Sequence, residues 1–528
     1  MAVGGLSAIN RAFNLVPKRA ESRQSERLRD TFVDSGIAVA LESVDNQVLF
    51  GRRGTGKTHA LRYLETTVST KDDIAIYCDL RNIGSPGGLF GGEPISLAEE
   101  ATRLLSDLIL TIHDGLLRAA IENNDLVSDV TFVDSLDNLE RSVREVKVEG
   151  ATQVSKEVGS STKKKSGIKF ALGISSKPSA NTSAQTETGV ETSSKIATST
   201  SGRQRPAIRF GDVAQSLRIL ASSLKSKRVW ILLDEWSSVR TDLQPYLGEF
   251  LVRCMLSLQE FTVKIAAIEQ QSNFMSIGPA GDTIGIEVGA DVTANIDLDK
   301  FMVFDQNEGR ARSFFRSLFL NHLTNGVDEN EKVDDLSSED DLIRIGFTDK
   351  RAFDELVKAA EGVPRDALNI AAKAALRATS RKISVNDIRV AGREWFQADK
   401  EANLRSRPEA QRLLYWIIDK VIKQKRARGF MVNQRSASSA LLLALFDARV
   451  LHILRRGYSA QDEPGERYIV YSIDYGAYVD LMQTQYAPQG LFSIGDEGDE
   501  YAEVPPHDLR TLRRTILDLA EFELHSAS

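Results

Sequence analysis

The chain has 528 residues, of which 67 are Lys or Arg and 74 are Asp or Glu, so its formal net charge is -7. This length predicts about two to four domains and a large buried core. The slightly acidic balance excludes a chain that is basic throughout, so any contact with nucleic acid must come from a local patch.

Nothing in the sequence indicates a membrane or a secreted protein. No run reaches about eighteen consecutive apolar residues, and the N-terminus lacks the charged and apolar regions of a signal peptide. We therefore expect a soluble, cytoplasmic protein with no membrane partner. The two cysteines, Cys78 and Cys254, lie in predicted strands or helices without metal-ligand spacing, so we interpret them as buried apolar side chains.

Residues 1–45 form a mixed, charged N-terminal segment. Within it, Arg19 to Arg29 indicates a helix, and Ile37 to Leu41 is an apolar stretch ahead of the first strand. In nucleotide-binding domains a segment in this position often packs on the adenine.

The next stretch predicts a strand, a phosphate-binding loop and a helix. The apolar run Val48 to Phe50 precedes a glycine-rich loop, and helix-forming residues follow it. Glycines allow a tight turn that directs backbone N–H groups at phosphates, where the helix N-terminus adds partial positive charge. In this motif the lysine reaches the β- and γ-phosphates and the threonine holds Mg²⁺. The candidate nucleotide-binding residues here are Gly51, Arg52, Arg53, Gly54, Thr55, Gly56, Lys57, Thr58 and His59.

Residues 46–305 alternate between apolar strands and amphipathic helices, which predicts an α/β core with a parallel sheet between helices. Strands are expected where short apolar runs are bounded by turn formers. After the first strand, we expect strands at 73–80, 228–234, 261–268 and 301–304, and helices at 96–123, 210–224 and 243–258.

The composition changes at residues 148–204, where Ser, Thr, Lys, Gly and Ala dominate. So few large apolar groups favour a disordered insert, because their burial cannot offset the entropy lost on ordering. The alternative is a long β-hairpin arm that orders on assembly, since Ile168 to Ile174 alternates like a strand and Thr186 to Thr200 does so weakly. Lys163 to Lys165 is interpreted as a solvated tip.

A second group of candidate residues ends the strand at 228–234. Asp234 and Glu235 follow a continuous apolar run, which is typical of a buried parallel strand. The end of such a strand lies beside the phosphate loop, where Asp234 can bind Mg²⁺ and Glu235 can orient and polarise the attacking water. Solvated acids at a strand end are the structural alternative.

The strand at 261–268 ends in the polar group Glu269 to Asn273, from which Gln270 is a candidate sensor of the γ-phosphate. A simple polar loop explains these residues equally well. Residues 306–400 are helical and form a predicted lid, in which Pro364 fits the first turn of a helix and Arg365 projects from it. An arginine on such a lid can reach the γ-phosphate and report the nucleotide state.

These motifs, in this order and separation, resemble an AAA+ ATPase of the clade of origin-recognition initiators, with the signal-transducing ATPases that use a Gly-x-Pro motif as nearby relatives. The motifs that carry the resemblance are Gly51 to Thr58, Asp234-Glu235, the polar strand end near Glu269, and Gly362-Val363-Pro364-Arg365. It covers roughly residues 30–400. It implies ATP and Mg²⁺ as cofactors, an αβα core, a helical lid, and commonly a winged helix afterwards.

Two departures from that family matter. Initiators often place Asn at the end of the fourth strand, where this chain has Glu269 and Gln270. AAA+ rings usually carry an arginine finger between that strand and the last one, yet residues 270–299 contain no Arg or Lys. Arg240 and Arg253 are weak candidates for that role, so a slow nucleotide switch is favoured over an ordinary hydrolytic ring.

Residues 405–528 predict a winged-helix-like α+β domain. Helices are expected at 410–422 and 436–446, two strands at 450–454 and 467–473, and a closing helix at 508–524. Basic residues gather here against an acidic whole, and such a patch could bind duplex DNA, although a solvated face or a protein-contact surface explains it equally well. The patch consists of Lys420, Lys423, Lys425, Arg426, Arg428, Arg435, Arg449, Arg455 and Arg456.

We therefore expect an ATP-binding and ATP-hydrolysing switch with catalytic residues Lys57, Glu235 and Arg365 and metal-binding residues Thr58 and Asp234. Its expected partners are ATP or ADP, duplex DNA, and a protein partner or a homo-oligomer. The main alternative is a nucleotide-gated sensor or effector ATPase of a prokaryotic antiphage system that acts by oligomerisation. A scaffold that binds ATP without hydrolysis is disfavoured by the intact Asp234-Glu235 pair.

Overall fold

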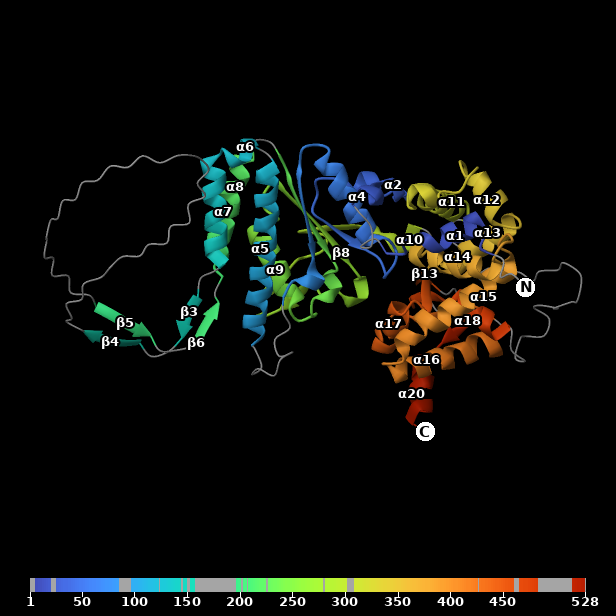
Figure 1. The fold of residues 1–528 in the computed structure, drawn as a ribbon. Helices are drawn as coiled ribbons and strands as arrows, with labels where there is room; N and C mark the ends of the chain where they lie inside the picture. The colour runs from blue at the N-terminus through green and yellow to red at the C-terminus, as the bar shows by residue number, and fades with distance from the viewer. Residues whose placement is uncertain are drawn as a thin grey trace, which may run out of the picture.

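The computed structural model describes residues 5–19, 25–84, 96–122, 124–143, 146–149, 152–156, 196–200, 203–206, 208–224, 227–278, 281–301, 308–425, 427–459, 465–482 and 515–527. Figure 1 shows the central sheet with its helices, a helical lid beside the sheet, and the C-terminal domain next to the lid.

A five-stranded parallel sheet forms the core, in the order β11-β1-β8-β7-β2. The two central strands β7 and β8 are buried along their whole length, as expected for parallel strands covered on both faces. The predicted αβα fold class is therefore confirmed. The strands are β1 (Gln47–Phe50), β2 (Ile74–Asp79), β7 (Val229–Asp234), β8 (Phe261–Ala267) and β11 (Thr293–Asp297).

Helices cover both faces of this sheet. The helix α4 (Lys57–Ser69), which follows the phosphate loop, packs on one face with the short α3 (Ala38–Leu41). On the other face lie α5 (Leu97–Glu122), α7 (Val130–Val143), α8 (Phe210–Ser223) and α9 (Gln244–Cys254), with α6 (Asn124–Val127) between α5 and α7. Both cysteines are buried here, as predicted, and burial raises the pKa of each thiol to about 12.

The last strand of the sheet is β11, and the prediction of a strand at 301–304 is wrong at Phe301, which ends the helix α10 (Leu298–Phe301). Residues 302–304 lie outside the described residues. The strand β11 is an edge strand in which Ile296 is buried and its neighbours are largely exposed. An edge strand needs only one apolar face, so its polar sequence lacked the continuous apolar run that marked the central strands.

Antiparallel strand pairs form at the two ends of the predicted insert. β3 (Val146–Glu149) pairs with β6 (Arg203–Pro206), and β4 (Thr152–Lys156) pairs with β5 (Ile196–Thr200). At these ends of the insert, the pairing agrees with the predicted β-hairpin arm rather than with a disordered insert. The predicted strand at Ile168 to Ile174 lies outside the described residues. Figure 1 places these strands on the side of the core that faces away from the lid.

The lid contains α11 (Glu308–Thr324), α12 (Glu339–Gly346), α13 (Lys350–Ala360), α14 (Pro364–Ala378) and α15 (Val385–Trp395). Its helices begin where the sequence offers side-chain caps, such as Asp349 before α13 and the Ser384 capping box before α15. Helix α1 (Ala8–Leu15) of the N-terminal segment packs on α14, and α2 (Ser25–Thr31) packs on α4.

The C-terminal domain carries a four-stranded sheet in the order β13-β14-β12-β15. Strand β12 was not predicted, and the predicted closing helix is wrong at Ile516–Leu517, where β15 pairs with β12 in parallel. The elements are α16 (Pro408–Ile418), β12 (Gly429–Asn433), α17 (Ala440–Asp447), β13 (Leu451–Tyr458), β14 (Tyr468–Ile473), α18 (Tyr475–Met482), β15 (Ile516–Leu517) and α20 (Leu519–Ala527).

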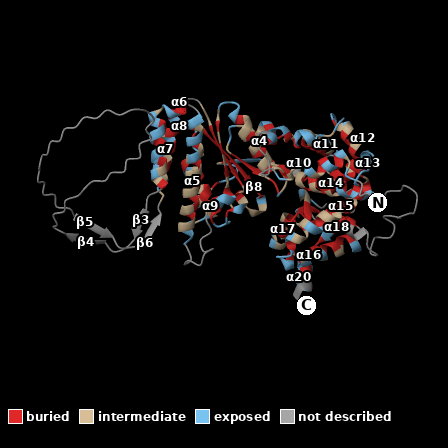
Figure 2. Ribbon diagram, in the orientation of Figure 1, coloured by how far each residue is buried: buried red, intermediate tan, exposed pale blue. Residues whose placement is uncertain are grey.

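One hydrophobic core runs through α1, the lid and the C-terminal domain. Figure 2 shows buried residues along the central sheet and between the helices of the lid and the C-terminal domain. Within the part of the chain that the structure describes, no helix combines the length and apolar character needed to cross a bilayer.

Candidate nucleotide site

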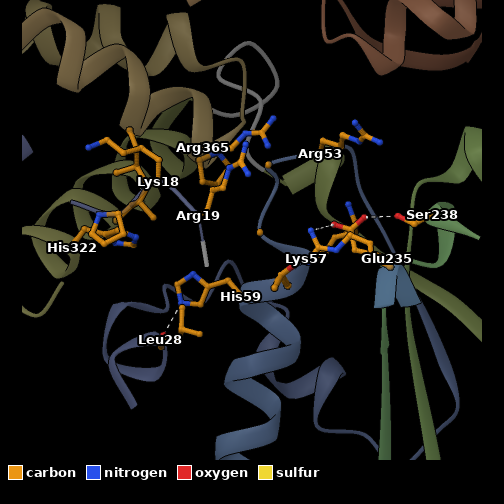
Figure 3. A pocket seen from close by; sticks show the side chains of 18 residues that line it. Lys18, Arg19, Leu28, Arg53, Lys57, His59, Glu235, Ser238, His322 and Arg365 are labelled. Atoms are coloured by element: carbon orange, nitrogen blue, oxygen red, sulfur yellow. Dashed lines mark hydrogen bonds and ion pairs between the residues drawn. The ribbon is translucent and has the colours of Figure 1, made fainter. Parts of the chain in front are cut away.

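A cavity of about 340 Å³ lies where the phosphate loop, the N-terminal segment and the lid meet. Figure 3 shows its labelled side chains converging from these separate elements. It is lined by Pro17, Lys18, Arg19, Leu28, Arg53, Gly54, Gly56, Lys57, Thr58, His59, Arg81, Glu235, Ser238, Leu318, His322, Pro364, Arg365 and Leu368.

The phosphate loop has the backbone that its glycines allow. Gly54 and Gly56 take φ values of 88° and 103°, a region that L side chains rarely adopt. Lys57 is buried, and its ammonium donates to the backbone oxygens of Gly51 at 2.7 Å and Arg52 at 3.0 Å. Burial lowers the pKa of Lys57, although Glu235 and Asp234 act in the opposite direction. These carbonyl bonds hold the lysine inside the loop beside the cavity.

Asp234 and Glu235 end β7 next to this loop, as predicted. Asp234 is fully buried, and its two carboxylate oxygens accept from the Tyr77 hydroxyl at 2.6 Å and from the Glu235 N–H at 2.8 Å. Glu235 has a left-handed backbone, with φ 58°, and its side chain lines the cavity. Ser238 donates to the Glu235 carboxylate at 3.4 Å.

Arg365 brings the lid onto the phosphate loop. Its backbone N–H donates to the Gly54 oxygen at 3.2 Å, and a Cβ on Gly54 would lie 2.9 Å from the Arg365 side chain. The Arg365 Nε is buried and has no hydrogen-bond partner among the described residues. Burial, together with nearby Arg449, lowers the pKa of Arg365. A half-buried guanidinium whose shielded Nε has an unused donor is a strong candidate to bind an anion in the cavity.

Several basic side chains of the cavity were not predicted as site residues. Lys18 and Arg19 come from the N-terminal segment, Arg81 follows β2, and His322 belongs to α11. No motif marks them, because they reach the cavity through tertiary packing. The only available signal was the basic run that includes Arg19, which was interpreted as part of a helix.

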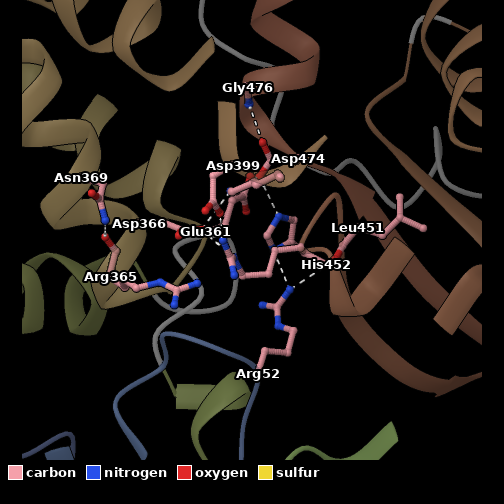
Figure 4. A network of polar contacts seen from close by, with 12 residues as sticks. Arg52, Glu361, Arg365, Asp366, Asn369, Asp399, Leu451, His452, Asp474 and Gly476 are labelled. Carbon is pink, nitrogen blue, oxygen red and sulfur yellow. Dashed lines mark hydrogen bonds and ion pairs between the residues drawn. The ribbon is translucent and has the colours of Figure 1, made fainter. Parts of the chain in front are cut away.

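Arg52 was predicted as a nucleotide-binding residue, but its side chain points away from the cavity (Figure 4). Its guanidinium pairs with Asp299 at 2.8 Å and donates to the Leu451 oxygen at 3.2 Å and to His452 Nδ1 at 3.0 Å. It also lies 4.8 Å from the centre of the Phe446 ring. The side chain therefore binds the C-terminal domain, and only the backbone of Arg52 remains available to the loop.

Gln270 does not line the cavity either. The short helix Glu269–Gln271 turns toward the C-terminal domain, where Gln271 donates to Asp447 at 2.7 Å and Glu269 pairs with Arg456 at 2.8 Å. Spacing placed these residues at the correct end of β8, but it could not show which way the turn faces. Arg240 and Arg253 pair with acids of their own surroundings, namely Glu100, Asp242 and Glu249.

Behind Arg365 lies a buried network of charged groups that joins the lid to the C-terminal domain (Figure 4). Lys400 pairs with Asp366 at 3.0 Å and with Asp474 at 2.5 Å, and His452 donates to Asp474 at 2.9 Å. Arg449 pairs with Asp366 at 3.3 Å. Since His452 also contacts Arg52, a continuous chain of contacts runs from the phosphate loop to Asp366, the neighbour of Arg365.

The predicted basic patch of the C-terminal domain does not form a single surface. Arg428 and Arg449 are buried and pair with acids of the lid and of the segment that follows it, so the prediction is wrong for these two residues. The sequence could not separate them from surface cations, because their carboxylate partners lie far away in the chain. Arg426 lies outside the described residues. Lys423, Lys425, Arg435, Arg455 and Arg456 are exposed, and Lys420 is half-buried.

Comparisons with known proteins agree with the resemblance deduced from the motifs. A family model described as ORC-CDC6-like matches residues 15–77, which include the phosphate loop. A solved structure of a Walker-type ATPase of Pyrococcus abyssi covers 90% of this chain and 100% of its own, at 14% identity and a TM-score of 0.38, a likeness too low to carry an argument. No curated protein matches the chain. The family match therefore supports an ORC-like phosphate-loop region over residues 15–77.

The residues present fit a nucleotide with Mg²⁺. Thr58 and Asp234 offer hydroxyl and carboxylate oxygens, the hard ligands that Mg²⁺ prefers. The guanidinium of half-buried Arg365, with its unused Nε, and the ammonium of Lys57 supply positive charge where phosphates would lie. Arg53 from the loop and Lys18 and Arg19 from the N-terminal segment add further positive charge to the same cavity.

Proposed function

We propose that the protein binds Mg-ATP in this cavity, hydrolyses it slowly, and uses the nucleotide state to change the contacts between core, lid and C-terminal domain. One observation carries the proposal: Lys57, Glu235 and Arg365, from three separate elements, line one cavity at the carboxyl end of a parallel sheet. Ligands of α/β proteins bind at that edge.

In the proposed reaction, Lys57 and the loop N–H groups bind the β- and γ-phosphates, and Glu235 orients a water for in-line attack on the γ-phosphorus. Thr58 and Asp234 hold Mg²⁺, which neutralises phosphate charge when bound. Arg365 neutralises charge on the γ-phosphate from the lid. Positioning and charge stabilisation supply the catalysis, since none of these residues needs to form a covalent bond.

The contacts of Arg52 support coupling to the C-terminal domain. A loop that rearranges around phosphates must move or strain the side chain that His452 and Leu451 hold. The same chain of contacts reaches Asp366, beside Arg365, through Asp474 and Lys400. Nucleotide binding would thus act on the C-terminal domain from both sides, through the loop and through the lid.

For the C-terminal domain we propose a winged helix that contacts duplex DNA. Helix α16, strand β12, helix α17 and the antiparallel strands β13 and β14 follow one another in the order of that fold, with β14 between β13 and β12. Arg435 and Arg455 are exposed there and could bind phosphates. DNA retention that falls with salt, and falls further in Arg435→Ala/Arg455→Ala, would support this role; retention unchanged by the substitutions would contradict it.

The second candidate is a nucleotide-gated sensor or effector of a prokaryotic antiphage system. It is favoured by the paired strands β3–β6 and β4–β5, which project from the core as an assembly arm would, and by the lack of Arg or Lys in residues 270–299, where a ring would carry its finger. Ligand-triggered assembly distinguishes this function from the first.

The test is ATP turnover by the wild type and by Glu235→Gln, each with and without duplex DNA, while light scattering follows mass in solution. We expect Glu235→Gln to abolish turnover and to retain ATP binding, because the amide cannot polarise the water as a carboxylate does. Glu249→Gln, on α9 outside the cavity, is the matched control.

The outcomes separate the candidates. Turnover that DNA raises supports the DNA-coupled switch. Turnover that ignores DNA, combined with a larger assembly of Glu235→Gln in ATP, supports the sensor. A wild type that neither binds nor hydrolyses ATP would overturn the proposal.

A further inference from the structure

The metal-holding carboxylate Asp234 has a side-chain partner from the neighbouring strand. Tyr77 of β2 donates its hydroxyl to Asp234 Oδ2 at 2.6 Å, while the Glu235 N–H donates to Oδ1. Each carboxylate oxygen has two lone pairs, so one lone pair on each oxygen remains for a metal ion or its water. The orientation of the carboxylate is therefore fixed, while each oxygen keeps a lone pair for a metal ion or its water.

Tyr77 is itself held by the helix that follows the phosphate loop. The Arg62 guanidinium carbon lies 3.4 Å from the centre of the Tyr77 ring, and Arg62 pairs with Glu65 at 2.8 Å. Arginine stacks well on aromatic faces because its guanidinium is planar and weakly hydrated. Burial and the adjacent Asp234 carboxylate raise the pKa of Tyr77, so its hydroxyl keeps the proton that it donates.

Helix geometry connects this contact to the second metal-holding residue. Thr58 and Arg62 are four residues apart on α4, so they lie on one face of the helix. A continuous series of contacts thus joins Thr58 to Asp234. It runs along the first turns of α4 to the Arg62 guanidinium, then through the Tyr77 ring and hydroxyl to the Asp234 carboxylate. Each step is a direct contact or a turn of helix.

We propose that Tyr77, supported by Arg62, is a positioning residue that sets the orientation of Asp234 and its separation from Thr58 for Mg²⁺. The inference deepens the proposed function and rests on it. Partners behind metal ligands of this kind typically contribute about tenfold or more to metal affinity. Tyr77 touches neither the nucleotide cavity nor the reacting atoms, so it acts through Asp234.

The experiment measures Mn²⁺ binding to the full-length protein with ATP by electron paramagnetic resonance, and ATP binding in EDTA by calorimetry. For Tyr77→Phe we expect about tenfold weaker Mn²⁺ affinity with ATP affinity in EDTA unchanged. Tyr63→Phe is the matched control, because it removes a tyrosine hydroxyl of α4 that donates to Glu42 at 3.4 Å, away from Asp234. Arg62→Lys keeps the charge and loses the planar stack, so it should weaken Mn²⁺ in the same direction.

Mn²⁺ affinity in Tyr77→Phe that equals or exceeds that of the wild type would overturn the inference. If Tyr77→Phe does not fold, Arg62→Lys decides by the same measurement. A wild type that binds ATP neither in EDTA nor with Mn²⁺ present would instead overturn the proposed function. The two failures are therefore distinguishable.

Discussion

At the scale of single residues, His452 shows how a buried network sets a protonation state. An arginine can only donate, so His452 Nδ1 must accept from Arg52, and Nε2 then carries the proton that it donates to Asp474. The ring is neutral in this arrangement. Burial lowers its pKa to about 3, and Arg52 acts in the same direction, although the hydrogen bond to Asp474 opposes them.

This pKa predicts how stability depends on pH. Between about 3 and the ordinary value of 6.5 the unfolded chain binds a proton at His452 that the native protein does not, so stability is lost as pH falls through this window. The slope from this one group is at most about 1.4 kcal/mol per pH unit. We expect a shallower loss in His452→Gln than in the wild type when urea unfolding is measured from pH 6.5 to 4.5.

His113→Gln, on α5 and outside the network, is the control for the loss of a histidine elsewhere in the chain. Carboxylates of the unfolded chain, with ordinary pKa values of about 4, begin to bind protons at the lower end of this window in the wild type and in both variants alike, so the difference in slope reports His452. Equal slopes in His452→Gln and the wild type would show that His452 is protonated in the native protein.

At the scale of elements, the insert begins and ends in the antiparallel pair of β3 and β6, which connects it to the core. Glu149 of β3 lies opposite Arg203 of β6, so a two-residue turn can join these strands. We expect that replacing residues 150–202 with Asn-Gly leaves ATP turnover and the melting temperature unchanged, because the described residues of this range, 152–156 and 196–200, do not line the cavity. Loss of ATP-dependent assembly in this variant, with turnover intact, would assign the insert to oligomerisation.

The elements also show how far sequence reasoning reaches. The strands β7 and β8 and the helix α4 were predicted because continuous apolar runs, glycines and helix formers report local structure. The edge strand β11 was missed because one exposed face hides the apolar signal. Strand β12 was missed because its apolar run, Phe430 to Val432, is only three residues long and follows a basic segment.

The candidate site divides in the same way. Lys57 and Glu235 were placed by motif, and both line the cavity. Arg52 and Gln270 also occupy the positions that the motifs predict, but neither side chain lines the cavity. Arg52 binds the C-terminal domain instead, because the direction of a side chain depends on what packs against it. Tyr77 occupies an ordinary position of a buried strand, and only the neighbouring β7 shows that it meets Asp234.

At the scale of the whole molecule, the lid and the C-terminal domain are joined by buried charge as well as by apolar packing. Glu361 ends α13 of the lid, and it pairs with Arg428, which precedes β12; both side chains are almost fully buried. Arg428 also donates to the Ile473 oxygen at 3.0 Å. Because one hydrophobic core includes both parts, they should unfold together.

Removing one member of this pair leaves a buried charge without its partner. We expect Arg428→Met to lower the free energy of unfolding by about 3–5 kcal/mol, because Glu361 is left in the interior without its ion-pair partner. The double variant Arg428→Met/Glu361→Gln should recover much of that loss, since it removes both charges. Urea unfolding, followed by circular dichroism, measures both.

The pair of Glu269 with Arg456 gives the matched surface comparison, because both of its side chains are more than a third exposed. Arg456→Met should cost no more than about 1 kcal/mol, because water and salt screen such pairs. The C-terminal domain is thus bound in two different ways. The lid binds it through the buried Glu361–Arg428 pair, and the segment after β8 binds it through the exposed Glu269–Arg456 pair. A nucleotide that moves the loop can therefore shift the Glu269–Arg456 contact at little cost, but it must also move the buried Arg52 side chain that Leu451 and His452 hold, while the lid and the C-terminal domain move as one unit. If Arg428→Met cost no more than Arg456→Met, the two parts would not form such a unit.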